Sequence, residues 1–234
     1  AITKVIAGVA KKSRVISEPE RKLTAYHEAG HAVCAHVLDH VSPVHQVTIV
    51  PRGRAGGFTM QLPVEDKFYA TKNEMKENLI VLLGGRVAEE LTLDDISTGA
   101  SNDLERVAST ARQMVTKYGM SEKLGPMAFG DSEEEVFLGN SIGNKRNYSE
   151  EVASEIDQEI RSIVDIAYKK TRTLLNDNMD RLEYVAQALL IYETLDAEQF
   201  IKAFNKELDL TPKQETAATE TEEVIEVKES QTED

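Results

Sequence analysis

Apolar residues recur every three or four positions over most of residues 16–210, a spacing typical of amphipathic helices. The first such stretch follows Ser17 and a glutamate three residues later. This capping-box pattern marks a helix start, and we expect a helix over about 18–39. A second capping-box pattern, at Thr71, predicts a helix that runs to about Leu91.

The second half of the chain shows the same helical spacing with further start signals. Polar residues that favour helix N-caps precede each apolar stretch. We therefore expect helices that start with Ser101 as the cap, at Asn147 or Ser149, at about 180, and at Asp196.

The pattern changes between the first two helices. Val47 and Ile49 alternate with polar residues, as do Phe58, Met60 and Leu62, on either side of a connection rich in Pro, Arg and Gly. Alternation of this kind predicts two short strands. The fold class expected is mainly α, with a small β-hairpin or sheet beside the first helix.

The C-terminal segment 211–234 differs from the rest in composition. It has eight acidic residues against two lysines, many threonines and no aromatic residue. Such a segment cannot bury enough apolar surface to fold, so we expect an acidic disordered tail after a domain over 16–210.

Composition excludes several classes of protein. With 41% hydrophobic and 29% charged residues the chain is typical of soluble proteins, and its longest apolar run, residues 79–83, is too short to cross a membrane. A net charge of −14 argues against a nucleic-acid partner. The single cysteine, Cys34, rules out an internal disulfide.

The stretch "YHEAGHAV" in the first helix carries the candidate chemistry. His27 and His31 lie four residues apart on one helical face, where two imidazoles can reach one metal ion, and zinc is the ion that this pattern favours. Glu28 is turned away from the ligand position but can accept a proton from water. A catalytic zinc site needs a third protein ligand.

Three patterns compete for the third ligand. The extended HExxHxxGxxH form is excluded because Cys34 and Val37 stand where it needs Gly and His. An ExxxD pair on the following helix is offered by Glu90 and Asp94. Asp103 is the remaining alternative, since the first turn of a helix keeps a carboxylate ionised.

The stretches "AYHEAGHAV", "VHQVTIVPRGRAGGFT", "GGRVAEEL", "STGASNDLERV" and "YGMSEKLGP" appear in an order and spacing that resemble a known family. It is the peptidase domain of the FtsH family of ATP-dependent zinc metalloproteases, the M41 type, and the resemblance covers about residues 1–208. It implies a zincin-like fold and hydrolysis of unfolded polypeptides or membrane proteins. It also implies one zinc per chain, held by His27, His31 and Asp103, with Glu28 as catalytic base and Glu89 as a residue that supports the site.

Members of this family carry a membrane anchor and a P-loop ATPase module, and they form hexamers. The present sequence has no GxxxxGK[ST] motif, so we expect no ATP binding by this fragment. Residues 1–15 resemble the end of the ATPase module. The resemblance places the full-length protein at the cytoplasmic face of the cell membrane, with this fragment soluble. An alternative role is a hexamerisation scaffold with little activity of its own.

Substrate binding is the least defined of these expectations. An extended polypeptide can add as a strand to a sheet edge through backbone hydrogen bonds. We expect this edge strand within residues 45–62.

Overall fold

The computed structural model describes residues 16–51, 56–63, 65, 67–93, 95–129 and 148–211. The expected ATPase remnant over 1–15 lies outside the described residues, as does the acidic tail beyond Thr211. Both remain predictions.

The protein is mainly helical with a small sheet, as the periodicity predicts. The 3-10 turn η1 (Thr98–Ala100) directly precedes one of the six α-helices of the described part. The elements are α2 (Glu18–Val37), β1 (Val44–Thr48), β2 (Phe58–Gln61), α3 (Lys72–Leu93), α4 (Ser101–Thr116), α5 (Glu150–Asp177), α6 (Met179–Tyr192), β3 (Thr194–Asp196) and α7 (Ala197–Phe204).

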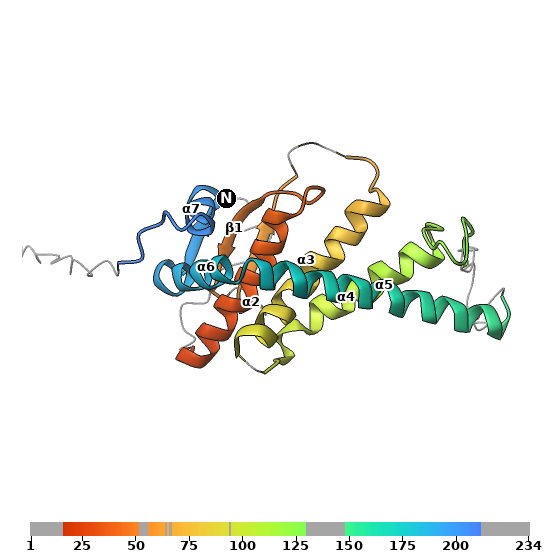
Figure 1. Cartoon of the computed structure of the whole chain (residues 1–234), viewed down its shortest axis with the longest axis horizontal. Coiled ribbons are helices and arrows are strands. Elements are labelled where there is room, and N and C mark those ends of the chain that lie inside the picture. Colours follow the sequence, from red (N-terminus) through yellow and green to blue (C-terminus); the bar gives the residue numbers. More distant parts are fainter. Residues whose placement is uncertain are drawn as a thin grey trace, which may run out of the picture.

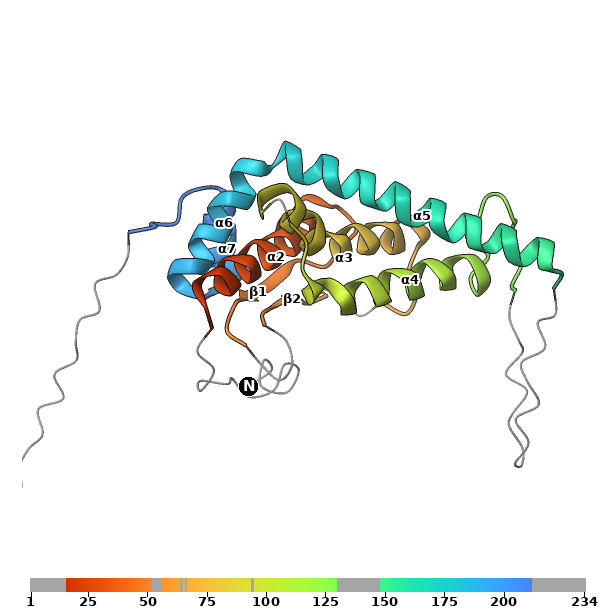
Figure 2. The ribbon, with the colours of Figure 1, turned by 90° about the horizontal axis from the view of Figure 1, so that it is seen from below.

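Helices α2 and α3 lie at the centre of the molecule. The long helix α5 and the shorter α6 cover one side of this pair, and the sheet lies on the other side (Figures 1 and 2). All α2 residues from Ala25 to Ala35 are buried, as is the stretch Leu79–Gly85 of α3. The HExxH stretch is therefore in the hydrophobic core, where burial of apolar surface holds it in place.

Two glycines allow α2 and α3 to approach closely. A Cβ added to Gly30 would lie 2.4 Å from the carbonyl oxygen of Gly84, and a Cβ on Gly84 would lie 2.7 Å from that of Gly30. Neither distance is possible between real atoms, so only glycine fits at this crossing. This contact explains why α3 tolerates a glycine that costs about 1 kcal/mol in a helix interior.

Most of the start signals act as the sequence predicts. Ser17 and Asp196 form full capping boxes, and Ser149 accepts a hydrogen bond from Val152 N. Thr71 accepts a hydrogen bond from Glu74 N at 3.2 Å.

The expectation that Ser101 caps α4 is wrong. The N-cap is Ala100, which makes no side-chain hydrogen bond, and Ser101 is the first helical residue. The cap function moves upstream to Ser97, whose hydroxyl accepts from Gly99 N at the start of η1. A single 3-10 turn thus leads into α4, and the Ser101 N–H at the helix start donates to the Thr98 carbonyl.

The sheet contains a strand that the sequence pattern did not predict. Strand β3 has three residues, too few to show alternation, and it pairs antiparallel to β1 with Leu195 opposite Val47. The strand order is β2-β1-β3, so β2 and β3 are the edges. No helix in the described part of the chain is long and apolar enough to cross a membrane.

Candidate functional site

His27 and His31 point their imidazoles to the same place. They are one turn apart in α2, and their Nε2 atoms lie 3.1 Å from each other. Each residue keeps only 8% of its surface exposed. The α2 helix is packed too tightly for either ring to turn away, so the pair is preorganised.

Asp103 completes a cluster of three ligand atoms. Its Oδ2 lies 3.4 Å from the Nε2 atom of His27 and 3.4 Å from that of His31. Ligands about 2.0–2.1 Å from a tetrahedral zinc ion lie about 3.3 Å from one another. The three measured separations match this edge length, and two imidazoles with one carboxylate suit zinc chemically.

The other ring nitrogen of each histidine is held by an acceptor. His27 Nδ1 lies 2.7 Å from Glu89 Oε1, and His31 Nδ1 lies 2.7 Å from the carbonyl oxygen of Val81. A carbonyl only accepts, so His31 Nδ1 donates, and in a neutral imidazole of this tautomer Nε2 carries the lone pair. Such contacts fix the orientation of a metal-binding imidazole.

Glu89 is a buried carboxylate, and both of its oxygens have hydrogen-bond partners. Its side chain is fully buried, and it accepts hydrogen bonds from Ser97 N at 2.7 Å and from the Ser97 hydroxyl at 3.1 Å. Burial alone would raise the pKa of Glu89, but the hydrogen bonds from His27 and Ser97 lower it. Glu89 thus contacts the ring nitrogen of His27 that faces away from the ligand cluster, and its supporting role at the site remains a prediction.

The site favours a positive charge at the position between its ligands. Burial opposes protonation of His27, yet the hydrogen bonds to Asp103 and Glu89 outweigh burial and raise the pKa of His27 to about 10. Burial likewise acts against the charged form of Asp103, but the two histidines hold its pKa well below the usual range. A divalent cation supplies the same positive charge.

Glu28 lies beside the ligands and binds none of them. It is buried, and burial raises the pKa of its carboxyl. Its Oε2 accepts a hydrogen bond of 2.8 Å from the Thr59 hydroxyl on β2. The contact fixes the carboxylate and leaves Oε1 available to exchange a proton.

Gly85 provides the space in which the imidazoles lie. A Cβ at this position would be 2.5 Å from His27 Cε1 and 2.6 Å from His31 Nε2. Together with the Gly30–Gly84 crossing, this explains the glycine pair of α3.

Glu90 faces away from the site. Its carboxylate accepts a hydrogen bond from the Tyr168 hydroxyl and forms an ion pair with Arg172, both on α5. The geometry therefore favours Asp103 over Glu90 as third ligand, and Asp94 lies outside the described residues. The full assignment of ligands remains a prediction.

A cleft of about 720 Å³ opens in front of these residues. Strand β2 forms one wall with Phe58, Thr59 and Gln61, and Asn102, Asp103 and Arg106 of α4 form another. The Gln61 Nε2 atom is buried and has no hydrogen-bond partner among the described residues. Buried polar atoms without partners are rare in native proteins, which makes this amide a candidate donor to a bound ligand.

Sequence reasoning missed three contributors to the site: Thr59, Ser97 and the Val81 carbonyl. A carbonyl has no signature in a sequence, and a threonine in a strand is ordinary. Ser97 offered a weak signal, because it precedes the short "TGA" turn that leads to Asp103.

The chain is similar to known proteins over most of its length. The chain is 69% identical over 208 residues to ATP-dependent zinc metalloprotease FtsH 2 of Alkaliphilus metalliredigens, covering 89% of this chain and 30% of the relative. It is 54% identical over 200 residues to ATP-dependent zinc metalloprotease FtsH of Bacillus subtilis, covering 85% of this chain and 31% of the relative.

The chain thus spans about a third of the length of these curated relatives. The model of peptidase family M41 matches residues 14–203, a range that holds both histidines, Glu28, Glu89 and Asp103. The zinc ligands proposed from geometry thus lie within the matched region, and the chain belongs to peptidase family M41.

Proposed function

We propose that this chain hydrolyses peptide bonds with a zinc ion held by His27, His31 and Asp103. The observation that carries the proposal is the cluster of three ligand atoms, all within 4.8 Å of one another, with the buried Glu28 beside it. A structural metal site has no need of a carboxylate that is not a ligand.

Glu28 is the general base of the proposed reaction. When bound, zinc would lower the pKa of a water molecule to about 7 and polarise the scissile carbonyl. Glu28 Oε1 accepts the proton of the attacking water and then donates it to the leaving amine. Thr59 keeps the carboxylate in place through both transfers.

Strand β2 is the element that we expect to bind substrate. It is an edge of the sheet and lines the cleft. An extended polypeptide that pairs with β2 would be held through its backbone, which accommodates many sequences. Unfolded polypeptides and membrane proteins are therefore the proposed substrates.

The names of the relatives describe ATP-dependent proteases. We extend this to the full-length protein as a proposal: a membrane-anchored homo-hexamer at the cytoplasmic face, in which an ATPase module feeds substrate to this domain.

The test replaces Glu28 with Gln and measures both bound zinc and degradation of casein. Glu28→Gln keeps the ligands, so zinc content should stay near one per chain while proteolysis falls at least about 100-fold. Glu90→Gln is the matched control, because Glu90 contacts α5 and should leave activity near that of the parent.

Near-normal proteolysis by Glu28→Gln would refute the mechanism. The scaffold alternative gives a different result, in which parent and Glu28→Gln both lack activity with zinc fully loaded. The buried Glu28–Thr59 contact at the ligand cluster favours catalysis over the scaffold role.

A further inference from the structure

A second cavity lies away from the active-site cleft. It has a volume of about 320 Å³ and is enclosed by α3, α5 and the end of α4. Its floor is apolar, with Leu79, Met114 and Ile163 among the lining residues. Ile166 at its edge is 53% exposed, which is high for an isoleucine beside a hydrophobic core.

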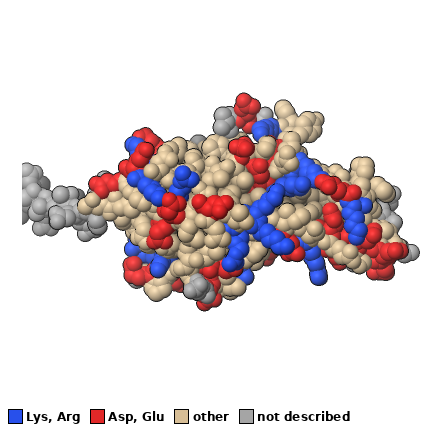
Figure 3. Space-filling model, in the orientation of Figure 1, with Lys and Arg blue, Asp and Glu red and all other residues tan. Residues whose placement is uncertain are grey.

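The rim of this cavity is basic. Four lysines, Lys72, Lys76, Lys123 and Lys170, face two acidic residues, Glu122 and Glu159. Figure 3 shows Lys and Arg gathered over the middle of this face, on a protein whose net charge is −14. An excess of positive charge here is therefore a local feature.

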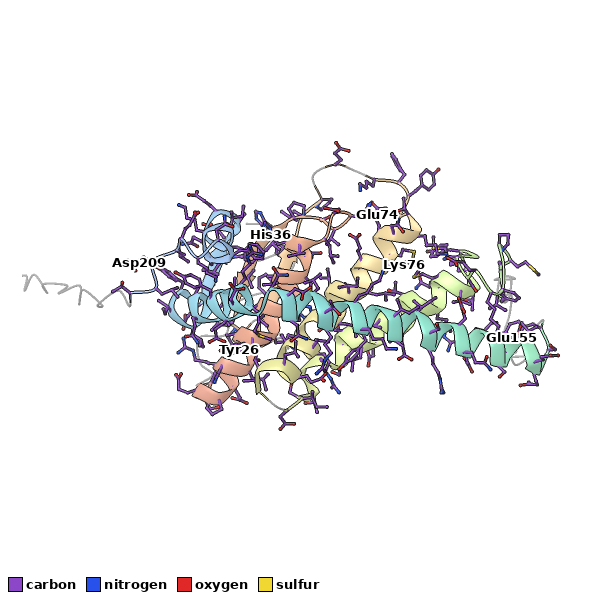
Figure 4. The ribbon with its side chains drawn as sticks, in the orientation of Figure 1. Tyr26, His36, Glu74, Lys76, Glu155 and Asp209 are labelled. Atoms are coloured by element: carbon purple, nitrogen blue, oxygen red, sulfur yellow. The ribbon has the colours of Figure 1, made fainter. Side chains whose placement is uncertain are left out.

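Two of the lysines form no close ion pair, although Lys76 interacts electrostatically with Glu122. Lys72 pairs with Glu122 at 3.0 Å and Lys123 with Glu155 at 3.8 Å. Within the part of the chain that the structure describes, Lys76 and Lys170 form no ion pair within 4.0 Å. Figure 4 labels Lys76 beside α3, just above α5 in this view.

The C-terminal segment of the same chain has the complementary chemistry. Residues 222–229 read "EEVIEVKE", so three aliphatic side chains stand among four glutamates and one lysine. The aliphatic groups match the floor of the cavity, and the carboxylates match its rim. An apolar floor with a few charged groups is the usual composition of a binding pocket.

The segment is long enough to reach the cavity. The chain after α7 is tied to α6, because the Tyr184 hydroxyl donates to the Leu208 carbonyl at 2.7 Å. Part of α6 and the last turns of α5 lie between this Tyr184–Leu208 contact and Lys170. At a rise of 1.5 Å per helical residue, the distance from the contact to Lys170 is about 30 Å at most. The twelve residues 212–223 can span about 40 Å when extended.

We propose that residues 222–229 bind in this lysine-rimmed cavity of their own chain, with Val224, Ile225 and Val227 on the apolar floor. Carboxylates of the segment then pair with Lys76 and Lys170. The closure costs only the entropy of a short loop, which grows slowly with its length.

Hydrogen–deuterium exchange of the intact chain, read by mass spectrometry, tests this proposal. Peptides that contain 222–229 should exchange about tenfold more slowly in the parent than in the double variant Lys76→Glu with Lys170→Glu. The tail sequence is the same in both proteins, so intrinsic exchange rates are equal. The variant Lys22→Glu with Lys117→Glu is the matched control, because both lysines are exposed and neither lines the cavity.

The reciprocal variant changes Val224, Ile225 and Val227 to Ser. Backbone amides of residues 159–170 in α5 should exchange faster in this variant than in the parent. If charge reversal unfolds the protein, Lys76→Gln with Lys170→Gln replaces it, and circular dichroism checks the fold. Tail exchange at the unprotected rate in the parent would overturn the proposal. Protection that increases with protein concentration would also overturn it, because the occupant would then be a second copy.

Discussion

Gly85 shows how one residue without a side chain shapes the metal site. A Cβ there would lie 2.6 Å from both Nε2 atoms that we propose as ligands. Gly85→Ala should therefore displace the imidazoles and weaken zinc binding about 10- to 100-fold, the usual effect of disturbing the surroundings of a ligand. A zinc titration against a competing chelator measures the change.

Gly56→Ala is the control for this prediction. Gly56 also lines the cleft, but a Cβ there would meet Thr24 Oγ1 at 3.6 Å, an ordinary contact. Equal affinities in the two variants would show that the close approach of Gly85 has no role in metal binding.

Removing the charge should have a different effect at each of Asp103, Glu89 and Glu90. Asp103→Asn leaves two ligands and should lose most of its zinc. Glu89→Gln should bind zinc about 10- to 100-fold more weakly and recover in excess metal, because it acts through His27. Glu90→Gln should match the parent. Zinc content after dialysis distinguishes them, and a loaded Asp103→Asn beside an empty Glu90→Gln would reverse the assignment.

At the scale of elements, Tyr26 joins α2 to α6. Its hydroxyl lies 2.7 Å from both carboxylate oxygens of Glu183, and burial together with this acid raises the pKa of Tyr26 to about 12. The pKa in the unfolded chain is about 10. The stabilisation is thus fully present below pH 10 and is lost as pH rises towards 12.

Tyr26→Phe should lower the free energy of unfolding by about 1 kcal/mol at pH 8, the typical value of one hydrogen bond. Urea denaturation at pH 8 and at pH 11 measures the effect. The difference between parent and variant should shrink at the higher pH, because Tyr26 of the unfolded parent loses its proton above about pH 10 and this favours unfolding, whereas the variant has no hydroxyl to ionise. A constant difference would mean that Tyr26 stabilises the helices by packing alone.

At the scale of the whole molecule, the site joins three helices that are distant in sequence. His27 and His31 come from α2, Glu89 from α3 and Asp103 from α4. Zinc that binds only the folded chain should stabilise it by about 2.7 kcal/mol at a free concentration 100 times the dissociation constant.

Chelation should consequently lower the midpoint of thermal unfolding, and added zinc should restore it. Asp103→Asn should show a much smaller response to zinc. Calorimetry with and without EDTA makes the comparison, and an unchanged midpoint in the parent would mean that zinc binding is not linked to folding.

Local patterns in the sequence determined much of this protein. Helical periodicity and the caps at Ser17, Thr71, Ser149 and Asp196 predicted the helices, because these signals act within a few residues of each other. The spacing of His27 and His31 placed both rings on one face for the same reason. Strand β3 escaped prediction, since its pairing with β1 depends on residues about 148 positions away.

Only the tertiary structure decided among the distant partners of the histidines. Spacing along the chain left both Glu90 and Asp103 open as ligands, and packing turned Glu90 to Arg172 while η1 brought Asp103 to the two Nε2 atoms. The hydroxyl of Thr59 on Glu28 and the carbonyl of Val81 on His31 likewise depend on how β2 and α3 pack against α2. Local sequence sets which side chains share a face, whereas the burial of apolar surface between elements sets which faces meet.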